Sequence, residues 1–77
     1  MKLRQIGSNQ TEVTLNPNIQ VLFSYETPVA CVHHGEVFRT DKKWSVTTSK
    51  HINRWLDGRE AKIASQVFFD TLVLEAR

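Results

Sequence analysis

Cysteine, glycine and long apolar runs are all scarce in this sequence. Because Cys31 is the only cysteine among 77 residues, the chain has no internal disulfide available. The three glycines stand far apart, which excludes a glycine-rich phosphate loop. No run of about 18 apolar residues occurs, so we expect no membrane-spanning helix. The first residues are basic but not continuously apolar, so we expect no secretory signal and a cytoplasmic protein.

The composition is that of an ordinary folded domain. Hydrophobic residues make up 40% of the chain and charged residues 23%, which excludes a disordered or fibrous protein. A chain of this length buries only about 60% of its unfolded surface, and its core alone rarely contributes more than about 3–5 kcal/mol. We therefore expect one domain over residues 1–77, and a partner subunit that helps to stabilise it.

The N-terminal half of the sequence predicts short strands joined by turns. Polar and apolar residues alternate over 2–6 and 11–15, and residues 19–25 are rich in β-branched and aromatic side chains. Two further strands are predicted at 29–33 and 36–40. The predicted turns are residues 7–10, Asn16-Pro17-Asn18, Glu26-Thr27-Pro28 and His34-Gly35. This order of four to five strands favours a small antiparallel sheet.

The pattern changes to a helical period after the sheet. Ile52, Trp55 and Leu56 form an apolar stripe, so a short helix is predicted over about 48–57. The hydroxyl residues at 47–49 are candidate N-caps, with Thr47 or Thr48 as the capping side chain, and Gly58 is a candidate C-cap. Lys50 would then lie in the first turn, where a cation opposes the helix dipole.

Apolar residues continue with helical spacing towards the C-terminus. They predict a C-terminal helix over about 60–76, although Ser65 is a candidate N-cap that would divide the segment into two helices. A strand over 67–74 is the alternative, since that run is rich in phenylalanine, valine and leucine. The predicted fold class is α+β, with a small antiparallel sheet followed by a short helix and a C-terminal helical segment.

Positive charge is concentrated in residues 39–62, which we call the basic segment. It carries seven lysines and arginines against three acidic residues, a net charge of +4. Hydroxyl groups, cations and a helix N-terminus together suit phosphate groups, and an aromatic ring can stack on a base. The alternative is a capped helix with a core tryptophan and solvated lysines. The candidate anion-binding and nucleic-acid-binding residues are Lys42, Lys43, Trp44, Thr48, Ser49, Lys50 and Arg54.

Metal binding and catalysis have little support in the sequence. Cys31, His33, His34 and His51 are the only soft metal ligands, and they lack the paired spacing of a structural zinc site. No nucleophile stands with a base and an orienting carboxylate, and Cys31 lies in an apolar stretch that would make it inert. We therefore expect no metal, no cofactor and no enzymatic activity.

The C-terminal apolar arc is wider than one core-facing stripe. A chain this small cannot bury the whole arc, so part of it is expected to meet another protein molecule. The candidate interface residues are Val67, Phe69, Leu72, Val73 and Leu74. We expect either a homo-oligomer such as a dimer, or capture of a host protein.

Three segments of the sequence resemble a known family. They are residues 7–13, 23–30 and 40–56, the last reading TDKKWSVTTSKHINRWL, and the similarity extends over about residues 3–56. The family comprises small uncharacterised proteins encoded by bacteriophages and by bacteria with phage-like genes, and it is a domain of unknown function. The resemblance implies a phage context and the host cytoplasm, where such small proteins bind a host protein or nucleic acid. The expected function is a non-enzymatic module for protein–protein contacts, and the alternative is a nucleic-acid-binding accessory protein.

Overall fold

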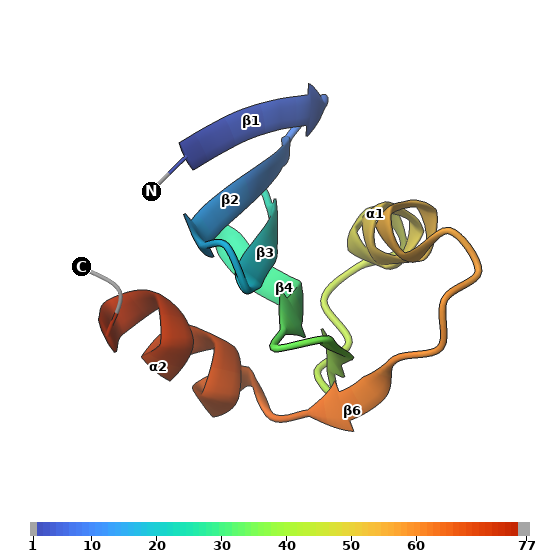
Figure 1. Cartoon of the computed structure of the whole chain (residues 1–77). Coiled ribbons are helices and arrows are strands. Elements are labelled where there is room, and N and C mark those ends of the chain that lie inside the picture. Colours follow the sequence, from blue (N-terminus) through green and yellow to red (C-terminus); the bar gives the residue numbers. More distant parts are fainter. Residues whose placement is uncertain (1, 76–77) are drawn as a thin grey trace.

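Six strands form one sheet with a helix on each face (Figure 1). The structure is a computed structural model and describes residues 2–75. The elements in chain order are β1 (Lys2–Gly7), β2 (Gln10–Asn16), β3 (Ile19–Ser24), β4 (Thr27–His33), β5 (Glu36–Thr40), α1 (Val46–Leu56), β6 (Lys62–Ala64) and α2 (Gln66–Glu75). Strands follow one another across the sheet in sequence order, and the first five pair antiparallel. The last strand, β6, lies parallel to β5, so α1 forms the crossover that a parallel pair requires.

The turns between the antiparallel strands follow from local residue chemistry. Asn9 adopts a left-handed φ of 60° in the β1–β2 turn, a conformation that asparagine tolerates well. In the predicted turn at Asn16-Pro17-Asn18, the Asn18 N–H donates to Asn16 Oδ1 at 2.8 Å, so the asparagine side chain closes an Asx turn. His34 and Gly35 both have positive φ, as the tight turn between β4 and β5 requires. The meander of short strands predicted from the sequence is therefore confirmed, except that Thr27 and Pro28, which were expected in a turn, pair with β3 as the start of β4.

Alternation along the strands divides the core into two layers. Leu22 of β3 packs with Ile52 and Leu56 of α1, on what we call the α1 face of the sheet. Its neighbour Val21 points the other way and packs with Phe69 of α2, on the α2 face. Each helix therefore covers the middle of one face, while β1 remains at the edge.

The start of α1 differs from the sequence expectation. Ser45 is the N-cap: its backbone is extended, and its Oγ accepts the Thr48 N–H at 3.1 Å. The helix therefore begins at Val46, two residues earlier than expected, and the expectation that Thr47 or Thr48 caps it is wrong. Lys50 consequently lies in the second turn, where the unfavourable effect of the helix dipole has largely fallen off. The helix ends at Leu56, and its C-cap is Asp57, with a left-handed φ of 50°, instead of the expected Gly58.

The C-terminal segment also differs from the expected helix over 60–76. Residues Lys62–Ala64 form β6, and the Ala64 carbonyl accepts the Asp41 N–H at 2.8 Å. Ser65 then starts α2, since its carbonyl and hydroxyl both lie within hydrogen-bond distance of the Phe68 N–H. The α+β class is confirmed, but the sheet has six strands instead of four to five and is mixed instead of antiparallel. Residue 76, the end of the expected helix, lies outside the described residues.

Neither helix among residues 2–75 is long and apolar enough to cross a membrane.

Candidate functional site

An apolar groove lies on the α2 face where the helix no longer covers the sheet. Leu3, Val13 and Val21 are cross-strand neighbours on β1, β2 and β3. Their exposure rises from 0% at Val21 and 6% at Val13 to 68% at Leu3, because α2 covers only the middle of the sheet. The groove has a volume of about 340 Å³. It is lined by Leu3, Thr11, Val13, Leu15, Phe23, Tyr25, Glu26 and Val73.

The groove continues along the C-terminal half of α2. A second depression of about 210 Å³ shares Phe23, Glu26 and Val73 with it and reaches Leu74. Leu74 is 67% exposed, so its side chain adds apolar surface at the end of the groove. We use the name apolar groove for both depressions together. An apolar surface of this kind, bordered by polar residues such as Thr11, Glu26 and Asp70, is typical of a contact site for another protein.

The structure divides the predicted interface residues into three groups. Val67 and Leu74 are exposed on α2, and Leu72 and Val73 are half-buried. Phe69 is completely buried on the α2 face, so it is a core residue and cannot contact a partner from the folded surface. The sequence did not separate these groups because residues 67–69 are uniformly apolar.

A separate depression, on the α1 face of the sheet, is lined mostly by residues of the basic segment. It has a volume of about 320 Å³ and lies between α1 and the β5–β6 edge. It is lined by Arg39, Thr40, Asp41, Lys42, Lys43, Trp44, Thr48, Ser49, Ile52 and Ile63, and we call it the basic depression. Of the predicted nucleic-acid residues, Lys50 does not line it. Arg54 lines a separate depression with Arg4 and Arg59.

Three of the predicted nucleic-acid residues are held by contacts within the chain. The ammonium of Lys42 lies 4.2 Å from the ring centroid of Trp44, and the Trp44 Nε1–H donates to Gln66 Oε1 at 3.2 Å. Thr48 is buried, and its Oγ1 lies 3.1 Å from Ser24 Oγ. Its hydroxyl is therefore part of the core and is not presented to a ligand, contrary to the sequence expectation.

Sequence reasoning missed a buried polar cluster beneath α1. Ser24 Oγ lies 2.8 Å from His51 Nδ1 as well as bonding Thr48. A signal for it existed, because Thr48 stands four residues before Ile52 and therefore lies on the same inward face of the helix. Ser24 is 2% exposed, so its hydroxyl ties β3 to α1 and is not accessible to a substrate.

The soft ligands lie on different parts of the fold. Cys31 is buried on the α2 face, where burial raises the pKa of its thiol to about 11, whereas His51 lies on the α1 face. His33 stacks edge-on against Phe68, with ring centroids 6.0 Å apart, and Phe68 also contacts Phe38. Among residues 2–75, no three histidine, cysteine or acidic side chains lie close enough to hold a metal ion.

The chain belongs to a family of unknown function (DUF8033), which it matches over residues 1–71. This match spans the whole sheet, α1 and the first half of α2. It confirms the resemblance to a domain of unknown function and assigns no activity. No curated protein and no solved structure gives a significant match.

Proposed function

We propose that this member of a family of unknown function is a non-enzymatic binding module that acts through protein–protein contacts at the apolar groove. The observation that carries the proposal is the exposed Leu3 of β1, which lies beside the buried Val13 in the apolar groove, together with the exposed Leu74 of α2. Burying one leucine side chain contributes about 1.5–3 kcal/mol. A partner that covered Leu3 and Leu74 would therefore gain a useful part of its binding energy from these two residues.

The partner is either a second copy of the chain, giving a dimer, or a protein of a bacterial host. A small domain gains more from such a contact than a large one, since its own core supplies little stability. The resemblance to phage-encoded proteins supports the host protein and the host cytoplasm as its setting. Membership of the family alone leaves both partners open.

The test compares matched apolar-to-acidic substitutions inside and outside the groove. Leu3→Glu and Leu74→Glu place a charge on the groove, while Val46→Glu does so at an equally exposed residue at the start of α1. Light scattering would measure self-association, and affinity capture from nuclease-treated bacterial lysate would measure binding to a host protein. We expect the groove variants to lose the association and Val46→Glu to keep it. Equal behaviour of all three variants would contradict the proposal.

Nucleic-acid binding is the second candidate, and the basic depression favours it. Arg39, Lys42 and Lys43 line one concave surface with only Asp41 as a counter-charge. The indole of Trp44 is occupied by Lys42 and Gln66, which favours phosphate contacts over base stacking. Binding of this kind would depend strongly on salt and little on sequence.

This candidate has its own matched pair of variants. Lys42→Glu and Lys43→Glu reverse charge inside the basic depression, while Lys50→Glu makes the same change outside it. We expect the first two to weaken binding to DNA or RNA in fluorescence anisotropy, and the third to have a smaller effect. Binding that did not change with salt, or that was insensitive to all three substitutions, would exclude this function.

A further inference from the structure

The edge strand β1 has an open side. It pairs only with β2 among the described strands, so alternate residues direct their N–H and C=O groups away from the sheet. Residues 2–6 are all exposed, and no described element covers this edge. An extended segment of another protein could therefore add to the sheet here through main-chain hydrogen bonds.

The two faces of β1 differ in chemistry. Leu3 points to the α2 face and lies at the lip of the apolar groove, opposite Val13. Lys2 and Arg4 point to the α1 face, because side chains alternate along a strand. A strand added beside β1 would meet an apolar surface on one face and cations on the other.

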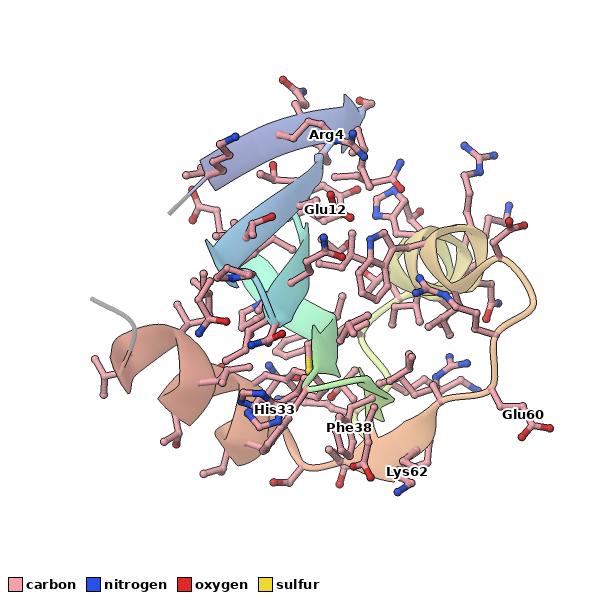
Figure 2. The ribbon with its side chains drawn as sticks, viewed as in Figure 1. Arg4, Glu12, His33, Phe38, Glu60 and Lys62 are labelled. Carbon is pink, nitrogen blue, oxygen red and sulfur yellow. The ribbon has the colours of Figure 1, made fainter. Side chains whose placement is uncertain are left out.

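Further arginines lie near Arg4 on the α1 face. Arg4, Arg54 and Arg59 line one depression of about 360 Å³ together with two acidic residues. One of these, Glu12, is already engaged: its carboxylate lies 3.4 Å from Arg4 on the neighbouring strand (Figure 2). The same carboxylate accepts the Trp55 Nε1–H at 3.0 Å. The guanidinium of Arg4 remains exposed, so it can still interact with a second carboxylate.

A second copy of β1 is poorly suited to this edge. In an antiparallel pair, directly opposite residues lie on the same face of the sheet. Pairing centred on Leu3 would place Lys2 opposite Arg4, and pairing centred on Arg4 would place the two copies of Arg4 opposite each other. Like charges in opposite positions are destabilising. Cations on an edge strand also commonly prevent this kind of self-association.

We propose that the β1 edge binds an extended segment in which apolar and acidic residues alternate. The apolar residues would continue the apolar groove beyond Leu3, and the acidic residues would face Lys2 and Arg4. The backbone of the segment would pair with the open side of β1. This inference rests on the proposed protein-binding function and names the chemistry of the partner.

The test uses peptides of about eight residues, the length of an ordinary strand. One alternates valine and glutamate, a second alternates valine and lysine, and a third is the glutamate peptide with alternate amides N-methylated. Titration followed by backbone amide NMR gives affinity and location together. We expect the glutamate peptide to shift the amide signals of β1, and the lysine and N-methylated peptides to bind at least about tenfold more weakly.

Variants of the protein complete the test. We expect Lys2→Glu to weaken binding of the glutamate peptide several-fold and Lys50→Glu, the matched control on α1, to leave it unchanged. Arg4→Glu is avoided because it would also break the ion pair with Glu12. Circular dichroism of Lys2→Glu would verify that the fold is retained.

The outcomes separate the two proposals. Equal binding of the glutamate and lysine peptides, or full binding after N-methylation, would overturn the strand-addition inference. If Leu74→Glu still abolished association in that case, the protein-binding function would stand without it. Concentration-dependent self-association of the unsubstituted protein that shifted the β1 amide signals would assign the edge to a second copy and would also overturn the inference. The Leu3→Glu and Leu74→Glu variants test separately whether the apolar groove binds a partner.

Discussion

Ser24 Oγ of β3 lies 2.8 Å from His51 Nδ1 of α1, and both side chains are buried. The same hydroxyl lies 3.1 Å from Thr48 Oγ1, which in turn accepts a hydrogen bond from Ser45 Oγ. Four side chains therefore form one continuous polar cluster from the central sheet to the N-cap of α1. Because a buried polar group without a partner is costly, this cluster fixes how α1 sits on the sheet.

The first prediction concerns the stability that this cluster provides. Ser24→Ala leaves the His51 Nδ1 without its partner, and we expect it to lower the free energy of unfolding by about 1–3 kcal/mol. Urea denaturation followed by tryptophan fluorescence would measure the change. Thr47→Ala removes an exposed hydroxyl from the same helix and serves as the control. A similar change in the free energy of unfolding of both variants would show that the buried cluster stabilises the fold no more than an exposed hydroxyl does.

The second prediction separates core from surface on α2. Phe69→Ala should lower the free energy of unfolding by about 3–5 kcal/mol, because Phe69 is completely buried against Val21 and Cys31. That loss equals most of the stability of so small a domain, so we expect the variant to be largely unfolded. Val67→Ala, at an exposed residue of the same helix, should change stability by less than about 0.5 kcal/mol. Circular dichroism during thermal unfolding would compare them, and a folded Phe69→Ala protein would contradict the assignment.

Local patterns in the sequence predicted most of the sheet. Alternation and turn chemistry placed the strands of residues 2–40, and the predicted strand at 36–40 has the bounds of β5. These signals are local, because they depend on neighbouring residues only. The three-residue strand β6 gave no such signal, since its conformation depends on pairing with β5, more than twenty residues earlier in the chain.

The candidate site was only partly predictable for the same reason. Lys42, Lys43 and Trp44 are adjacent in sequence, so their common location in the basic depression follows from chain connectivity. The apolar groove combines β1, β2, β3 and α2, and its existence depends on where α2 packs across the sheet. No periodicity within α2 indicates this, because its apolar residues occupy nearly all sides of the helix.

The third prediction concerns Gln66, which joins the start of α2 to the rest of the fold. Its Oε1 accepts from Thr40 Oγ1 at 2.8 Å and from Trp44 Nε1, and its Nε2 donates to the Pro28 carbonyl at 2.7 Å. Gln66→Glu keeps the acceptor but removes the donor, so we expect a loss of about 1–2 kcal/mol in urea denaturation. Gln20→Glu, an exposed glutamine on β3, makes the same chemical change and should have little effect. Equal stability of the two variants would contradict this role for Gln66.

The last prediction concerns the single thiol. Cys31 is fully buried, and burial raises the pKa of its thiol from 9.0 to about 11. Because the thiolate is the reactive form and burial also blocks the reagent, the folded protein at about pH 8 should react with iodoacetamide at least about a hundredfold more slowly than the urea-unfolded chain. Mass spectrometry of timed samples would give both rates. Equal rates would mean that the thiol is accessible, contrary to its place in the core.

The same pKa difference makes stability depend on pH. The folded state retains the Cys31 proton between about pH 9 and pH 11, whereas the unfolded chain releases it, so the stabilising effect is complete below about pH 9 and is lost as pH rises through that window. Cys31→Ala removes this contribution, so its urea midpoint, although lower throughout, should decline less steeply over the same window. Parallel declines in the urea midpoints of the two proteins would mean that groups other than Cys31 cause the loss of stability at alkaline pH.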